Sequence, residues 1–351
     1  MLNKNFWKNK KIFLTGNTGF KGSWLSLWLT LWGAKVSGYA LKPPTQPNLF
    51  ELCYLNELVD STLGDIRDLP KLKQVIRGAR PDIVIHMAAQ PLVRESYKNP
   101  IETFATNVMG TANVLEAMQG CGSVKAALIV TTDKCYENIG QRRGYKETDP
   151  LGGYDPYSSS KACAEIVTAS YRQSFFQETH CYVASARAGN VIGGGDFAAD
   201  RLVPDFVRSI LRGETLLIRS PKSVRPWQHV LEPLSGYLLL LENLALKGAK
   251  YAEAYNFGPE KQDAKPVIWL AESLCKKWGK GANFEVAKGK HPHEAHFLHL
   301  DITKAKKQLG WSPRWDLDMA LDKVVKWTAA YRAKANLREV CLAQIAEFLR
   351  S

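Results

Sequence analysis

The chain has 351 residues, of which 45% are hydrophobic, and it carries a formal net charge of +13. This length suits one large domain or two unequal ones, and the apolar fraction is typical of a globular protein and excludes a disordered one. The basic excess is compatible with a substrate that carries a diphosphate, or with a solvated surface alone. Because the basic residues are spread along the chain without an RNA-binding or helix-turn-helix pattern, we expect no nucleic-acid partner.

Cysteine usage and the lengths of the apolar segments indicate the compartment. The cysteines are odd in number and include no CxxC pair: Cys53, Cys121, Cys135, Cys163, Cys181, Cys275 and Cys341. This pattern argues against a disulfide framework and a zinc site. The most apolar helical stretch, at 24–32, is too short to span a bilayer, and the charged first residues do not form a secretory signal. We therefore expect a cytoplasmic protein with reduced thiols and no membrane partner.

The first predicted elements form a strand, a glycine-rich turn and a helix. An apolar strand at 12–14 is followed by three glycines at intervals of three and then by a helix at 23–32. Such glycines permit a tight turn, let the backbone approach a pyrophosphate and let the helix pack on the strand. The first-turn N–H groups of the helix add an anion site. This segment predicts a dinucleotide cradle made by Gly16, Thr18, Gly19, Phe20 and Gly22.

Strands and helices alternate through the first half of the chain. Further strands are expected at 34–41, 61–63, 82–86 and 126–132, and further helices at 71–78, 100–119 and 156–176. The alternation predicts right-handed βαβ units. The expected fold class is α/β, a Rossmann-type doubly wound parallel sheet with a smaller C-terminal α/β domain. We expect residues 1–185, with a return segment near 228–247, to bind the dinucleotide and residues 186–351 to bind the substrate.

Ligands of such sheets bind beyond the carboxyl ends of the strands. After the third strand, Asp65 is expected to accept a hydrogen bond from the adenine amino group beside Ile66, although an Asp before a helix is about as often an N-cap. Ala88 and Ala89 follow the fourth strand and are also expected to contact the cofactor. No acidic residue closes the second strand, where Lys42 could accept the 2′-phosphate of NADP. The local sequence therefore leaves NAD and NADP both open.

Tyr157 and Lys161 form a YxxxK pattern in the helix expected at 156–176. Residues four apart share one helix face, so the phenol and the ammonium point the same way. A phenol with a pKa of ~10 is a poor base at neutral pH until a nearby cation favours the phenolate, and Lys161 supplies that charge. Together with the glycine turn, the pattern predicts that Tyr157 accepts the proton when a hydride leaves a carbinol carbon.

These motifs together resemble the extended short-chain dehydrogenase/reductase family of nucleotide-sugar enzymes. The resemblance rests on GxxGxxG, Asp65, HMAA at 86–89, TNVMGTANV at 106–114 and YxxxK. It continues through RAGNVIG at 187–193, NFG at 256–258 and LGWSP at 309–313, and so covers nearly the whole chain. Within the family, four runs are similar to those of 4,6-dehydratases that act on CDP-glucose: GNTGFKGSWL, TTDKCYEN, RAGNVIGGGDFAADRLVPD and SVRPWQHVLEPL.

The resemblance implies NAD as the cofactor, CDP-glucose as the substrate and a set of catalytic roles. Tyr157 takes the O4 proton with help from Thr132, and Asp133 protonates the departing C6 hydroxyl as the alkene forms. Lys134 stands where related dTDP-glucose dehydratases have the glutamate that removes the C5 proton. It is either a neutral C5 base, at a cost of about 4 kcal/mol for a drop of ~3 pKa units, or a charged stabiliser of the enolate.

The resemblance also implies substrate contacts in the second half of the chain. Asn190, Arg201 and Arg225 lie in runs where relatives contact the diphosphate or nucleotide, and a guanidinium fork suits a phosphate pair. Arg201 could instead be a helix-start charge. His291, His293 and His296 lie close together, but no Cys or carboxylate completes a ligand set, so we expect no metal.

Two questions of assembly and activity stay open at the level of the sequence. The helices expected at 100–119 and 156–176 carry apolar positions on more than one side. Relatives dimerise through this pair, and packing within one chain is the alternative explanation of the pattern. The implied assembly is a homodimer or a dimer of dimers, and the implied pathway is deoxysugar, O-antigen and lipopolysaccharide synthesis. The alternatives are another nucleotide-sugar dehydratase or a 4-epimerase of the same family, and a non-catalytic dinucleotide-binding regulator. The Asp133 and Lys134 pair favours a dehydratase over an epimerase.

Overall fold

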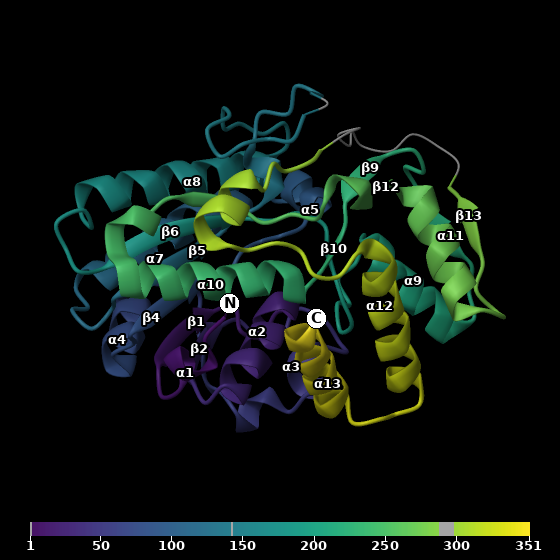
Figure 1. Cartoon of the computed structure of the whole chain (residues 1–351), viewed down its shortest axis with the longest axis horizontal. Helices are drawn as coiled ribbons and strands as arrows, with labels where there is room; N and C mark the ends of the chain where they lie inside the picture. Colours follow the sequence, from purple (N-terminus) through teal and green to yellow (C-terminus); the bar gives the residue numbers. More distant parts are fainter. Residues whose placement is uncertain (1, 142, 288–297) are drawn as a thin grey trace.

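A parallel sheet of seven strands lies at the centre of the computed structural model, which describes residues 2–141, 143–287 and 298–351 (Figure 1). The strand order is β11-β6-β5-β4-β1-β2-β3 and every neighbouring pair is parallel. The strands are β1 (Lys11–Thr15), β2 (Lys35–Ala40), β3 (Asp60–Leu63), β4 (Ile83–His86), β5 (Ala126–Val130), β6 (Tyr182–Arg187) and β11 (Ala254–Asn256). The predicted Rossmann-type parallel sheet is thus confirmed.

Helices cover both faces of the sheet, because successive residues of a strand point to opposite sides. Ile12 and Leu14 of β1 belong to one buried cluster with residues of α2 and α10, whereas Phe13 belongs to a second cluster with residues of α4 and α7. The covering helices are α2 (Phe20–Leu31), α4 (Leu69–Ala79), α7 (Gly110–Gln119), α8 (Pro156–Ser174) and α10 (Leu231–Lys247).

Most of the remaining elements lie beyond the carboxyl ends of the strands (Figure 1). Three small two-stranded sheets pair β7 with β10, β8 with β13 and β9 with β12. Their bounds are β7 (Val191–Ile192), β8 (Leu216–Ile218), β9 (Val224–Pro226), β10 (Gln228–His229), β12 (Ala264–Pro266) and β13 (Phe284–Val286). The longer helices in this region are α9 (Leu202–Arg212), α11 (Val267–Trp278) and α12 (Leu317–Arg332), and the last helix, α13 (Leu337–Arg350), returns to pack against α2. The division into two domains stays a prediction.

Short helices and turns complete the chain. They are α1 (Lys4–Trp7), α3 (Leu49–Leu52), α5 (Val93–Lys98), α6 (Pro100–Phe104), η1 (Leu55–Glu57), η2 (Ala105–Met109), η3 (Asp133–Cys135), η4 (Gly248–Tyr251), η5 (Lys261–Asp263) and η6 (Ala305–Leu309). The helix predicted at 100–119 is therefore interrupted by the π-helical turn η2. Here the buried Asn107 amide accepts a hydrogen bond from Gln90 N and donates to Gln90 O and to Ser160 Oγ. π-turns of this kind occur frequently at functional sites.

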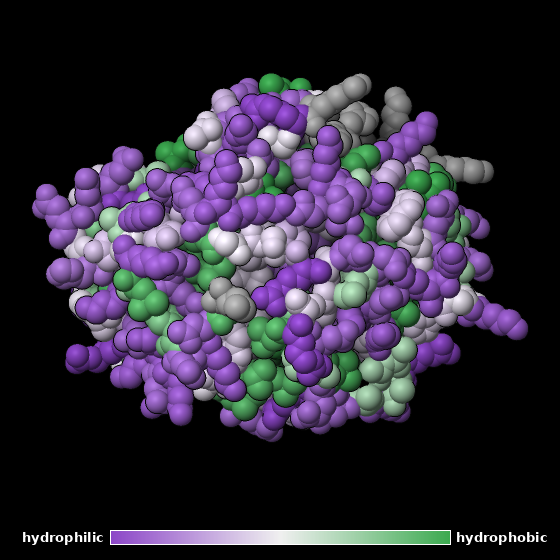
Figure 2. Space-filling model, in the orientation of Figure 1, coloured by the Kyte–Doolittle hydropathy of each residue, from purple (hydrophilic) through white to green (hydrophobic). Residues whose placement is uncertain are grey.

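The surface in the view of Figure 1 is mostly hydrophilic, with small separate hydrophobic areas (Figure 2). Among the helices of the described residues, none combines the length and the apolar character needed to cross a membrane.

Candidate active site

The glycine turn after β1 is closely packed at two of its three glycines, Gly16 and Gly22. Gly16 has a φ of +76°, and a Cβ there would lie 2.8 Å from Ala88 N after β4. A Cβ on Gly22 would lie 2.1 Å from Gly16 O, so the first turn of α2 rests directly on the loop. Gly19 is the N-cap of α2, and no side chain caps that end. A bare helix N-terminus over a glycine loop fits the pyrophosphate of a dinucleotide.

The cradle differs from the sequence prediction in where the helix begins. The prediction placed the start at residue 23, but α2 starts at Phe20, because glycine serves as the cap and the glycine at position 22 is tolerated inside the first turn. Thr18 also acts within the loop, since its hydroxyl donates to Leu41 O at 3.0 Å and ties the turn to the end of β2. Lys42, next along the chain, is exposed.

Asp65 follows β3, as predicted, and its carboxylate binds Arg67. An ion pair at 2.6 Å and a hydrogen bond from Arg67 N at 2.8 Å hold the pKa of this carboxyl below its ordinary value. The N-cap of α4 is Asp68, which accepts from Lys71 N, so the N-cap alternative for Asp65 is wrong. Ile66 O accepts from the side chain of Asn113. The adenine contact of Asp65 stays a prediction, as does the choice of NAD over NADP at this edge.

The carboxyl end of β5 is bound to helix α8 through three consecutive residues. Lys161 Nζ donates to Val130 O at 3.3 Å, and Thr131 Oγ1 donates to Glu165 Oε1 at 2.5 Å. Thr132 hydrogen-bonds with the Tyr157 phenol. Tyr157, Lys161 and Glu165 are one helical turn apart, which explains why one face of α8 meets successive residues of the strand end.

Asp133 follows Thr132 and is completely buried. Its Oδ1 accepts from Thr132 Oγ1 at 3.0 Å, while its buried Oδ2 has no hydrogen-bond partner among the described residues. Burial raises the pKa of this carboxyl above its ordinary value, against the charges of Lys134 and Arg225. Burial thus favours the protonated form of this carboxyl, which is the form that can donate a proton to a leaving group.

The Tyr157 phenol is buried beside Asp133. Burial raises its pKa to about 12, against the Thr132 hydrogen bond and the charge of Arg201, which both lower it. Lys161 is also buried, and burial lowers the pKa of its ammonium to about 8. The phenol is thus protonated at neutral pH, and its predicted activation by Lys161 together with a bound nicotinium stays a prediction.

Lys21, in the first turn of α2, is a site residue that sequence reasoning did not identify. Its ammonium lies 5.9 Å from the centre of the Tyr237 ring. Burial, followed by the charges of Lys161 and Arg201, lowers its pKa to about 7, against the charge of Asp133. The glycine turn therefore brings a further basic side chain close to Lys161 and Asp133. Its position in GFKG was visible in the sequence, but its direction depends on where α2 starts.

The three predicted substrate residues lie around the same cluster. Asn190 has a φ of +43° and a buried Oδ1 with no hydrogen-bond partner among the described residues. It follows Gly189, where a Cβ would overlap the Asp133 carboxyl. Arg225 is buried, and its charge lowers the pKa of Asp133. Arg201 pairs with Asp196 at 3.0 Å and is also the N-cap residue of α9. Their contacts with a substrate stay predictions.

The described residues contain no group of three or more His, Cys, Asp or Glu side chains placed to hold a metal ion. His291, His293 and His296 lie outside the described residues.

A family model described as GDP-mannose 4,6 dehydratase matches residues 13–324 of the chain. The chain belongs to this family. A CDP-glucose 4,6-dehydratase from Salmonella typhimurium strain LT2 is 54% identical over 336 residues, which cover 94% of each chain. This match confirms the resemblance to the nucleotide-sugar branch of the extended short-chain dehydrogenases/reductases.

Solved structures of the same fold include both dehydratases and epimerases. DesIV, a dTDP-glucose 4,6-dehydratase from Streptomyces venezuelae with NAD and TYD bound, is 25% identical with a TM-score of 0.77 and covers 92% of this chain and 98% of its own. A UDP-glucose 4-epimerase from Thermotoga maritima, solved with UDP-glucose, has a TM-score of 0.78 at 24% identity over 91% of this chain and 99% of its own. The fold of the GDP-mannose 4,6 dehydratase family therefore does not by itself separate the two reactions.

Proposed function

We propose that this protein is an NAD-dependent CDP-glucose 4,6-dehydratase, a hydro-lyase that converts CDP-glucose into CDP-4-keto-6-deoxyglucose and water. The observation that carries the proposal is the buried acid Asp133 beside the Tyr157 phenol. An epimerase needs an acid–base group at O4 but no acid for a departing C6 hydroxyl. The 54% identity to the Salmonella dehydratase supports CDP-glucose as the substrate.

The glycine turn, Asp65, Ile66, Ala88, Ala89 and Lys161 hold the cofactor. When bound, NAD would supply the hydride acceptor for C4 and the hydride donor for C6 within one turnover. Lys161 holds the strand end through Val130 O and presents its ammonium on the same helix face as the phenol. The bare N-terminus of α2 faces the pyrophosphate, and the buried surroundings exclude water from the reacting sugar.

Tyr157 accepts the O4 proton as C4 becomes a ketone, and Thr132 hydrogen-bonds the phenol and orients it. The ketone acidifies the C5–H bond. Asp133 then donates its proton to the C6 hydroxyl, which leaves as water while the C5–C6 alkene forms. Burial raises the pKa of Asp133 and so favours the protonated form that this step requires. Lys134 either removes the C5 proton as a neutral amine or stabilises the enolate as a cation.

On the substrate side, Asn190, Arg201 and Arg225 contact the CDP-sugar. Arg225 is buried close enough to Asp133 for its charge to act on that carboxyl, and Arg201 acts on Tyr157 in the same way. Both guanidinium groups therefore lie within reach of a sugar held between Asp133 and Tyr157. A bidentate contact to the diphosphate would fix the position of the sugar relative to these two residues.

The proposal extends to assembly and setting. Ile101, Met109 and Ile166, on α6, η2 and α8, are 81%, 56% and 56% exposed. Covering these side chains with the same helices of a second copy gives a homodimer, and two such dimers give a dimer of dimers. The protein acts in the cytoplasm, in deoxysugar synthesis for O-antigen and lipopolysaccharide. Light scattering of wild type and an Ile166→Glu variant tests the assembly.

Incubation of the purified protein and NAD with CDP-glucose tests the function. The expected result is a product with the alkaline absorbance of a 4-keto-6-deoxy sugar. Formation of CDP-galactose without that absorbance would support the 4-epimerase alternative. Binding of the dinucleotide without any turnover of CDP-glucose would support the regulator. UDP-glucose and dTDP-glucose, assayed in parallel, measure the preference for the CDP group.

A further inference from the structure

Glu165 lies one turn beyond Lys161 on α8, and its buried carboxylate joins that helix to two strands. Its Oε1 accepts from Thr131 Oγ1 of the β5 end at 2.5 Å, and its Oε2 accepts from Ser185 Oγ of β6 at 2.7 Å. The same Oε2 accepts from Arg187 Nη2 at 3.0 Å. The side chains of Glu165 and Arg187 are only 3% and 4% exposed.

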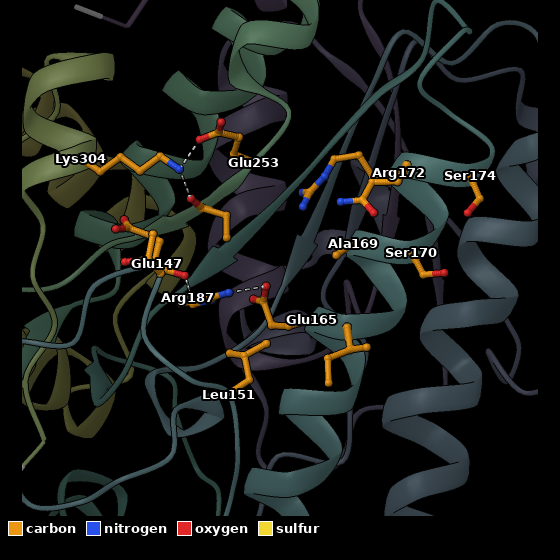
Figure 3. A pocket seen from close by; sticks show the side chains of 14 residues that line it. Glu147, Leu151, Glu165, Ala169, Ser170, Arg172, Ser174, Arg187, Glu253 and Lys304 are labelled. Atoms are coloured by element: carbon orange, nitrogen blue, oxygen red, sulfur yellow. Dashed lines mark hydrogen bonds and ion pairs between the residues drawn. The ribbon is translucent and has the colours of Figure 1, made fainter.

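Arg187 continues the network away from the helix. Its Nη1 donates to Tyr136 OH at 2.8 Å and to Glu147 O at 3.2 Å. Tyr136 OH in turn donates to Asn256 Oδ1 of the edge strand β11 at 2.7 Å. Figure 3 shows Glu165 and Arg187 pointing toward each other at the wall of a cavity of about 610 Å³ beside α8. The ion pair thus lies directly behind the carboxyl end of β5, which carries the proposed catalytic residues.

The position of the carboxylate matters because Thr131 lies between two residues of the catalytic cluster. The residue before it, Val130, holds the Lys161 ammonium, and the residue after it, Thr132, holds the phenol. A shift of α8 against β5 would therefore move both groups together. Glu165 provides the bond to the middle residue and fixes the register of helix and strand.

The charge of Glu165 matters because the Lys161 ammonium is buried among few anions. Three titratable groups from neighbouring elements interact with this ammonium. They are the Lys21 ammonium of α2, the neutral His86 imidazole of β4 and the Cys135 thiol of η3. Burial lowers the pKa of Lys161, and the charge of Glu165 is the main influence that raises it. Burial raises the pKa of the Cys135 thiol, so this group is uncharged at neutral pH and supplies no counter-charge.

We propose that Glu165 is a positioning residue of the active site: its carboxylate locks α8 onto the end of β5 and keeps the Lys161 ammonium charged at the pH of catalysis. The inference rests on the proposed function only for its kinetic readout. Its physical content, the protonation of Lys161, belongs to the protein without substrate.

Glu165→Gln keeps the shape of the side chain and removes its charge. Loss of an opposite charge next to a buried ammonium lowers its pKa by about one unit or more. The alkaline limb of the rate profile should then move down by about one pH unit, so that activity above the limb falls about tenfold and recovers as the pH is lowered. A purely structural role would instead reduce the rate equally at every pH. Glu147→Gln, in the wall of the same cavity, is the matched control and should leave the limb in place.

A direct readout does not depend on turnover. The pKa of Lys161 can be measured by an NMR titration of protein labelled with ¹³C at lysine Cε, in which the Lys161 signal is assigned by its absence from Lys161→Met. This pKa should be lower in Glu165→Gln than in wild type. If the single variant does not fold because Arg187 is left unpaired, Glu165→Gln with Arg187→Met removes both charges, and the lower Lys161 pKa should persist. An unchanged Lys161 pKa in a folded variant would overturn the proposal. An inactive wild type with a lowered pKa in the variant would overturn the proposed function alone.

Discussion

The substitution Gly189→Ala tests the catalytic acid through its packing. A Cβ at position 189 would lie 1.8 Å from Asp133 Oδ2 and 2.1 Å from Asp133 Cγ, whereas ordinary contacts begin at 3.4 Å. The carboxyl must therefore retreat by about 1.6 Å or rotate away. A general acid works only within hydrogen-bond reach of the proton acceptor and contributes about 100- to 10,000-fold. Formation of the 4-keto-6-deoxy product should accordingly fall at least about 100-fold.

The assay for this variant separates the two halves of the reaction. The three atoms nearest to the inserted methyl group all belong to the Asp133 side chain, so the clash falls first on that carboxyl. Oxidation at C4 should therefore continue, and reduced nicotinamide should accumulate in rapid mixing experiments because elimination no longer follows. Gly78→Ala, on the exposed face of α4 with no atom within 4 Å of the new Cβ, is the control and should have full activity. Product formation near the wild-type rate in folded Gly189→Ala would refute the role of the Asp133 carboxyl.

Three further predictions concern Lys134, Lys21 and Glu232. In Lys134→Met, reduced nicotinamide should still form while solvent exchange at C5 is lost, and exchange at the wild-type rate by NMR would rule out the base role. Burial lowers the pKa of Lys21 to about 7, so its charge destabilises the folded chain most at and below that pH. Lys21→Met should therefore raise the melting temperature at and below pH 7, and this gain should shrink toward pH 10.5. Thermal denaturation scans at several pH values measure the difference. Burial raises the pKa of Glu232 from 4.5 to about 7, so ionisation of this carboxyl destabilises the folded chain as the pH rises between these values. The melting temperature of wild type relative to Glu232→Gln should fall over this pH range. A difference that stays constant with pH would contradict the prediction.

The sequence was sufficient for the elements whose pattern is local. The five strands expected in the first half are all present. The strands β1, β4 and β5 are short apolar runs that are buried in the parallel sheet, whereas β3, with the sequence DSTL, is only partly buried. The glycine turn was recognisable because its spacing directly follows a predicted strand and precedes a predicted helix. YxxxK was recognisable because the helical period places both side chains on one face.

Features that depend on distant segments were not accessible in the same way. The edge strand β11 pairs with β6 through only three residues, too short a run to stand out in the sequence. The π-turn η2 depends on Asn107 finding Gln90 and Ser160. The Glu165 and Arg187 pair joins residues on α8 and β6, and a charged residue inside a helix usually indicates a solvated face.

The fate of the hydrogen at C4 tests the central claim most directly. CDP-glucose carrying deuterium at C4 should give a 4-keto-6-deoxy product with that deuterium at C6. The reason is that the same bound cofactor would take the hydride from C4 and return it to C6 of the sugar held between Tyr157 and Asp133. NMR and mass spectrometry of the product measure this transfer. Deuterium that remains at C4 in a CDP-hexose product, or a 4-keto product without deuterium at C6, would contradict the account.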